Sequence, residues 1–81
     1  PLKRERDKIE REMSEAQAAL SALEASLADE GLYQDDARKA ELSDLLSRQG
    51  EAQNRLDTLE QRWLEAEEAL EQREAELLDD A

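Results

Sequence analysis

The chain has no cysteine and no histidine among its 81 residues. Without cysteine it has no disulfide framework and no thiolate ligand for a metal ion. Without histidine its serines lack the base that usually activates a nucleophile, and no glycine-rich phosphate loop is present. We therefore expect no catalytic residue, no metal site and no cofactor within this chain.

Aromatic residues are also scarce, since phenylalanine is absent and only Tyr33 and Trp63 are present. With 38% hydrophobic residues and 42% charged residues, the composition is typical of long helices rather than of a globular core. No apolar run approaches the length of a membrane span and no signal-peptide pattern occurs. The absence of cysteine is compatible with a reducing cytosol. Because the chain begins at Pro1 rather than methionine, either an initiator methionine was removed or the chain is an excised fragment, and we expect a fragment.

Basic residues are few, at 11 against 23 acidic residues, and the net charge is −12. Such a chain is repelled by phosphate backbones and anionic lipid, which makes DNA a doubtful partner and a membrane an unexpected one. The one basic cluster spans residues 3–11. Ion pairs four residues apart are expected to neutralise it, and a nucleic-acid contact is the alternative. These pairs are Lys3–Asp7, Arg6–Glu10 and Lys8–Glu12.

Apolar residues recur at alternating spacings of three and four through two long segments, as in a coiled-coil seam. The clearest stretch lies between residues 56 and 70 and contains Trp63. At that position a tryptophan is usually part of the core, and an exposed anchor for a partner protein is the rarer interpretation. The residues expected to form the structural seam are Ile9, Met13, Leu20, Leu27, Leu32, Tyr33, Leu45, Leu56, Leu59 and Trp63.

Residues 29–36, with the sequence D-E-G-L-Y-Q-D-D, are the one clear break. We expect helices over residues 2–28 and 37–78, and the short turn predicts an all-α fold, an antiparallel two-helix coiled-coil hairpin. Gly31 is expected to end the first helix in a left-handed conformation, and Asp35 or Asp36 to cap the second. The turn lacks the ligand spacing of a calcium loop, so a weak divalent-ion site there is the less favoured interpretation.

Leu32 and Tyr33 are apolar residues within this turn. We expect them to cover Leu42 and Leu46 at the end of the hairpin, and an exposed recognition tip is the alternative. Gly50 lies at an outward position and weakens the second helix by about 1 kcal/mol relative to alanine.

Two registers of the hairpin are compatible with the seam. One places Ile9 opposite Trp63 and Arg6 opposite Ala66, and the other places Arg6 opposite Leu59. We prefer the first because it alternates large with small residues and keeps the layer volume constant. In that register the second helix has no partner beyond Leu70. Its last turns are expected to fray, to self-associate weakly or to pack on a parent protein.

Three stretches together resemble the C-terminal coiled-coil extension of the ABC-F family, in particular its Uup and YheS types. They are L-A-D-E-G-L-Y (residues 27–33), A-R-K-A-E-L (37–42) and L-E-Q-R-W-L-E-A-E-E-A-L-E (59–71). The resemblance implies a hairpin attached to the second ATPase domain of a cytoplasmic protein that acts at the ribosome. ATP and magnesium would belong to that parent, because no Walker motif is present here. The strong acidity departs from the nucleic-acid-binding versions.

The leading hypothesis is therefore a non-enzymatic accessory domain of an ABC-F ATPase, with the parent ATPase domains and the ribosome or a ribosomal protein as partners. A generic structural or dimerising coiled coil is the second hypothesis, suggested by Leu77 and Leu78 at the end of the chain. The third is a nucleic-acid-binding hairpin that uses the basic cluster.

Overall fold

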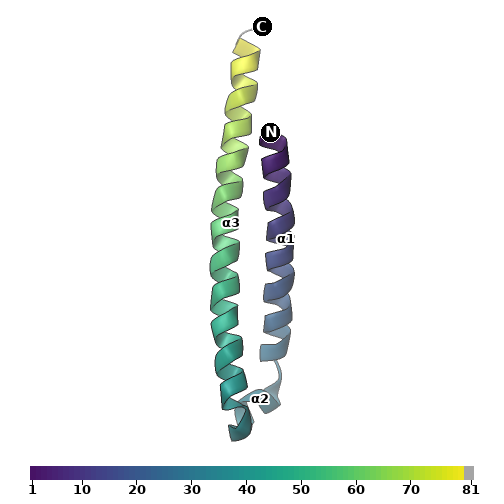
Figure 1. Cartoon of the computed structure of the whole chain (residues 1–81), viewed down its shortest axis with the longest axis vertical. Coiled ribbons are helices and arrows are strands. Elements are labelled where there is room, and N and C mark those ends of the chain that lie inside the picture. The colour runs from purple at the N-terminus through teal and green to yellow at the C-terminus, as the bar shows by residue number, and fades with distance from the viewer. Residues whose placement is uncertain (80–81) are drawn as a thin grey trace.

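The computed structural model describes residues 1–79, and nearly all of them are helical. The elements are α1 (Leu2–Leu27), α2 (Glu30–Gln34), the short 3-10 helix η1 (Asp36–Arg38) and α3 (Lys39–Asp79), with no strand in the described part. Figure 1 shows α1 and α3 side by side and antiparallel, joined through α2 at one end. The all-α hairpin expected from the sequence is therefore confirmed.

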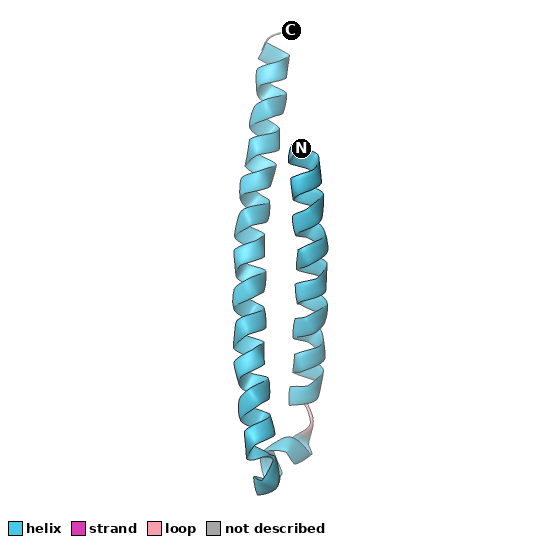
Figure 2. Ribbon diagram, in the orientation of Figure 1, coloured by secondary structure: helices cyan, strands magenta, loops and turns pink. Residues whose placement is uncertain are grey.

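The molecule is a rod of 68 × 16 × 14 Å. The N-terminus lies at one end beside the later turns of α3, and α2 lies at the opposite end (Figure 2). We call the α2 end the tip and the other end the base. Because α3 has 41 residues and α1 has 26, α3 continues past the start of α1 at the base.

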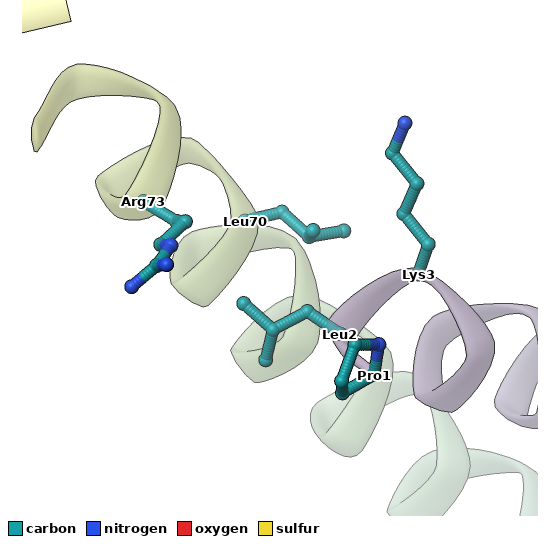
Figure 3. Close-up of a pocket in the computed structure, with 5 residues that line it drawn as sticks. All are labelled: Pro1, Leu2, Lys3, Leu70 and Arg73. Carbon is teal, nitrogen blue, oxygen red and sulfur yellow. The ribbon is translucent and has the colours of Figure 1, made fainter. Parts of the chain in front are cut away.

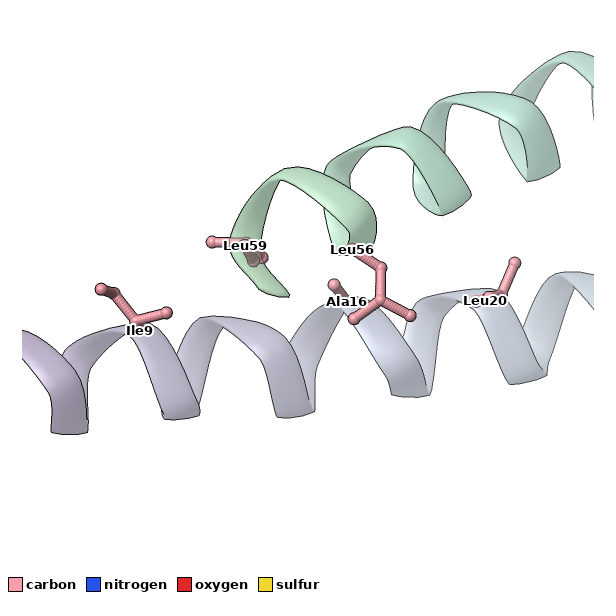
Figure 4. Close-up of a cluster of buried hydrophobic side chains, with 5 residues drawn as sticks. All are labelled: Ile9, Ala16, Leu20, Leu56 and Leu59. Atoms are coloured by element: carbon pink, nitrogen blue, oxygen red, sulfur yellow. The ribbon is translucent and has the colours of Figure 1, made fainter. Parts of the chain in front are cut away.

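The core is a single line of side chains between α1 and α3. Figure 4 shows five of its buried members, which are Ile9, Ala16, Leu20, Leu56 and Leu59. Met13, Ala52, Trp63 and Ala66 pack against them and are partly buried. Large residues are thus interleaved with alanines along both helices, which lets two helices approach closely without leaving voids.

Polar contacts between the helices identify the register. Arg6 Nη1 donates a hydrogen bond of 3.0 Å to Oε1 of Glu67, the neighbour of Ala66 in sequence. Near the base, Leu2 and Leu70 line one groove. Both contacts agree with the register that places Arg6 opposite Ala66. They exclude the register that places Arg6 opposite Leu59.

The connection between the helices is more ordered than the sequence suggested. The predicted turn at residues 29–36 contains the whole of α2, and the second long helix begins at Lys39 rather than at residue 37. The expectation for Gly31 is wrong, because no glycine in the described residues has a positive φ and Gly31 lies inside α2. The first helix ends instead at Leu27, and the residue that follows, Ala28, caps it in a right-handed conformation.

The two short helices of this connection are each capped by an aspartate, α2 by Asp29 and η1 by Asp35. Asp29 accepts a hydrogen bond from the backbone N–H of Gly31 at 3.0 Å, and Asp35 accepts one from that of Ala37 at 2.9 Å. Each carboxylate satisfies a backbone donor that the first turn of a helix leaves free. Capping by Asp35 was expected from the sequence, whereas the cap at Asp29 was not.

Candidate functional site

The structure places most of the predicted seam residues between the helices. Those with an exposed fraction below a tenth are Ile9, Leu20, Leu27, Leu32, Leu56 and Leu59. Met13, Leu45 and Trp63 are partly buried. Tyr33 is the exception among the ten, since 57% of it is exposed.

Tyr33 ties the tip to α1 through a polar contact rather than an apolar one. Its hydroxyl donates a hydrogen bond of 2.6 Å to the backbone carbonyl of Leu27. The last carbonyls of a helix have no partner within it, so this bond satisfies one of them. Leu46, which Tyr33 was expected to help cover, remains 50% exposed. Leu32, which is 1% exposed, is the apolar residue that fills the end of the hairpin.

Arg38, in η1, forms ion pairs with Asp29 and Glu41, and we call these three residues the clasp. Its Nη1 lies 3.0 Å from Asp29 Oδ2, and its Nε and Nη2 donate to the two carboxylate oxygens of Glu41 at 2.9 and 3.2 Å. Hydrogen bonds to Arg38 lower the pKa of both carboxyl groups, and the Gly31 N–H lowers that of Asp29 further. The same contacts, with Glu41 foremost, raise the pKa of Arg38. These carboxylates therefore stay ionised at neutral pH.

Sequence reasoning missed this clasp. The three-residue spacing of Arg38 and Glu41 on a helix was an available signal. No sequence signal indicated the contact between Arg38 and Asp29, because that contact depends on how α2 folds back. The remaining acids of the tip include Glu30 and Asp36, which are exposed. Within residues 1–79 no three acidic side chains come together in a way that could hold a metal ion.

A polar layer crosses the hairpin between the core and the base. Trp63 Nε1 donates a hydrogen bond of 3.0 Å to Glu10 Oε1, so the tryptophan contacts both the core and α1. Beside it, the pKa of Arg6 is raised, chiefly by its hydrogen bond to Glu67. Arg6 Nε is shielded from solvent and lies 3.9 Å from Glu10, too far for a hydrogen bond. Arg6 is therefore fixed between acids of both helices.

The basic cluster at residues 3–11 is paired differently from the expectation. Of the three predicted pairs, only Arg6–Glu10 is found, at 3.9 Å. Asp7 pairs with Arg6 at 3.6 Å, and Glu12 pairs across the hairpin with Arg62 at 3.7 Å. In the described residues, four cations of α1 have no carboxylate at ion-pair distance. They are Lys3, Arg4, Lys8 and Arg11.

The base of the hairpin carries an open groove of about 410 Å³. Figure 3 shows the residues that line it, which are Pro1, Leu2, Lys3, Leu70 and Arg73. Beyond the groove, Leu77 and Leu78 on α3 are 59% and 76% exposed. Among residues 1–79, neither long helix combines the length and hydropathy that a membrane-spanning segment needs.

Comparison with known proteins identifies the family. The family model described as "ABC transporter C-terminal domain" matches residues 2–68, which include α1, the tip and most of α3. No curated protein matches the chain, and no solved structure matches it. The matched range contains the core, the clasp and the polar layer, so the match covers the hairpin from α1 to Glu68. The chain belongs to the ABC transporter C-terminal domain family and is an accessory domain of an ABC protein.

Proposed function

We propose that this domain is a non-enzymatic arm of an ABC-F ATPase and helps that ATPase to engage the ribosome during translation. ATP and magnesium would act in the parent ATPase domains, in the cytoplasm. Family membership supports an ABC parent, and the resemblance of the tip and of the Trp63 region to ABC-F extensions supports the subtype.

The shape of the rod carries this proposal. The N-terminus lies at the base, and the tip lies at the far end of α1, which at about 1.5 Å per residue is about 39 Å away. A domain joined to an ATPase near its base would project the tip away from the ATPase. The tip of such an arm could reach a large assembly at a distance from the ATPase.

The tip has the charge of a surface that binds a basic protein. Glu30, Tyr33 and Asp36 are exposed at the tip, where Asp36 pairs with Lys39 at 3.5 Å. The clasp at Arg38 would hold the connection in one conformation before binding. Preorganisation of this kind reduces the entropy cost of association. Phosphate groups would be repelled by these acids, so a basic ribosomal protein fits the tip better than ribosomal RNA does.

The two carboxylates that bind Arg38, those of Asp29 and Glu41, are not suited to general acid catalysis. General acid catalysis at neutral pH needs a carboxyl group whose pKa is raised towards 7. The pKa values of Asp29 and Glu41 are lowered instead, because both groups bind Arg38. Their role is to hold the tip together.

The test is ribosome binding by the intact ABC protein, locked with a non-hydrolysable ATP analogue and measured by co-sedimentation. Reversing two tip charges, with Glu30→Lys and Asp36→Lys, should weaken binding about tenfold, which is about 1.4 kcal/mol. The matched control reverses Glu51 and Glu68, two exposed acids in the middle of α3, and should change binding less than twofold. Equal weakening by both pairs, or by neither, would contradict a contact at the tip.

Contact with RNA through the basic cluster is the second candidate. Lys3, Arg4, Lys8 and Arg11 favour it, because no carboxylate of the described residues neutralises them. Each phosphate contact contributes about 0.7–0.9 to the slope of log affinity against log salt. Replacing all four by glutamine should therefore lower that slope by about 3 if they contact phosphates. An unchanged slope would eliminate this candidate and leave the tip as the contact.

A further inference from the structure

The seam of the hairpin allows a second pairing of α1 with α3, displaced by one heptad, or about 10.5 Å along the helix axis. In the present register Arg6 lies opposite Ala66, and in the second register it would lie opposite Leu59. Large apolar residues still meet in the second register, so apolar packing alone does not forbid it. The layers in which they meet are Leu2 with Trp63, Ile9 with Leu56, Leu20 with Leu45 and Leu23 with Leu42.

Two arginines, one towards the base and one at the tip, hold the present register. Arg6 occupies a seam position of α1 and donates a hydrogen bond of 3.0 Å to Glu67. Arg38 stands one heptad before the seam residue Leu45, so it continues the seam of α3. In the present register it lies past the end of α1 and binds the two acids of the clasp at 2.9 and 3.0 Å.

A slide into the second register would break the contacts of both arginines. Arg6 would leave Glu67 and face Leu59, and Arg38 would leave the clasp and face Leu27. Loss of a partner by a buried cation is costly, and a polar residue at a seam position is an established way of specifying the register of a coiled coil. The margin is limited at Arg6, because its Nε is already shielded from solvent without a hydrogen-bond partner.

The connection at the tip is long enough for this slide. In the present register residues 28–44 join the layer of Leu27 to that of Leu45, and in the second register residues 28–37 would join Leu27 to Arg38. A link of that shorter length spans up to about 33 Å when extended, whereas the axes of packed helices lie about 8–10 Å apart. Residues 39–44 are already helical in α3, so the short helices α2 and η1 are the parts that rearrange.

We propose that the second register is an accessible state of this hairpin and that a slide of α3 against α1 carries a signal between tip and base. Arg6 and Arg38 hold the present register. A cationic group that competes with Arg38 for the acids of the clasp favours the second register. The same slide moves the start of α1 along α3 by about 10.5 Å at the base. This coupling belongs to the hairpin itself and does not require contact with the ribosome.

Cysteine pairs report the two registers, because the chain has no cysteine of its own. Leu23→Cys with Gln49→Cys reports the present register, and Ala16→Cys with Gln49→Cys reports the second. A displacement of one heptad exceeds the roughly 7 Å between Cα atoms that a disulfide tolerates, so each pair closes in one register only. Equilibrium exchange with glutathione in the dilute 81-residue chain gives the effective concentration of each pair, and the ratio of the two values measures the registers.

The present-register pair should exceed the second-register pair about tenfold or more when both arginines are intact. Arg6→Leu combined with Arg38→Leu should reverse the order by more than about threefold, because both new leucines gain apolar partners in the second register. Asp29→Asn with Glu41→Gln releases Arg38 but keeps a capping side chain on α2, and it should lower the ratio at least about threefold.

Arg48→Leu with Arg62→Leu is the matched control, since both arginines form ion pairs on α3 but lie outside the seam. It should change the ratio less than about twofold. Unfolding gives nearly equal values for the two pairs, because their loops have similar lengths, and it also removes the circular dichroism of the helices. If the double leucine variant unfolds, Arg6→Leu and Arg38→Leu alone decide, and each should lower the ratio. A ratio that the seam variants leave unchanged, or that the control lowers equally, would overturn the proposal.

Discussion

Replacing Leu59 by alanine should remove most of the stability of the hairpin. Leu59 is 2% exposed and packs in the cluster that contains Ile9 and Leu56. The change deletes three carbons, which at about 0.8 kcal/mol each corresponds to about 2.4 kcal/mol of lost transfer free energy. The cavity left between two helices raises the cost to about 3–4 kcal/mol. A core of this size rarely supplies more than about 3–5 kcal/mol, so the variant should be near its unfolding midpoint at 25 °C.

Leu64→Ala is the matched control, since the same chemical change is made five residues later on the same helix. Leu64 is 50% exposed, so at most half of the transfer term is lost, about 1 kcal/mol. Far-ultraviolet circular dichroism during heating and urea titration measures both variants. The midpoint of L64A should fall by a few degrees, whereas L59A should lose more than about 10 °C or its cooperative transition. Equal shifts would refute the conclusion that the seam, rather than helix propensity, holds the fold.

Three further changes probe the helix, the tip and its clasp. Gly50→Ala should raise the unfolding free energy by about 1 kcal/mol in the same melts, because a Cβ there meets no atom within 4 Å; a decrease would reveal hidden strain. Tyr33→Phe removes one hydrogen bond and should cost about 0.5–1.5 kcal/mol, and no loss would mean that water replaces it fully. Arg38→Gln should lower the melting temperature at pH 7, and this difference should shrink as the pH falls towards 2.5. The pKa values of Asp29 and Glu41 are lowered in the folded state, so their contribution is present above the unfolded values near 4 and is lost as pH falls through the lower folded ones. A difference in melting temperature between the Arg38→Gln variant and the unmodified protein that is as large at pH 2.5 as at pH 7 would contradict this reasoning.

The helices and their register could be predicted from the sequence because burial of leucine is worth far more than any competing local preference. The three–four spacing determines which face is buried, and the interleaving of alanines with larger residues selects one register. Arg6 also helped to select the register, because one register places it opposite Ala66 and the other places it opposite Leu59. The contact between Arg6 and Glu67 is the structural consequence of that choice.

The tip and the surface ion pairs could not be predicted in the same way. Whether Tyr33 covers a leucine or donates to a carbonyl depends on the path of α2, which the turn residues alone do not determine. On the helix surface, Glu12 can pair with Lys8 or reach Arg62 across the hairpin. Such alternatives differ by a few tenths of a kcal/mol, so sequence spacing cannot choose between them.

The hydrogen bond between Trp63 and Glu10 makes the protein its own optical probe. Because Trp63 is the only tryptophan, all indole fluorescence arises at one point between α1 and α3. Separation of the helices would hydrate the ring and release its N–H from the carboxylate, which shifts the emission to longer wavelength. Binding at either end of the arm that strains the hairpin can therefore be followed in solution without a label.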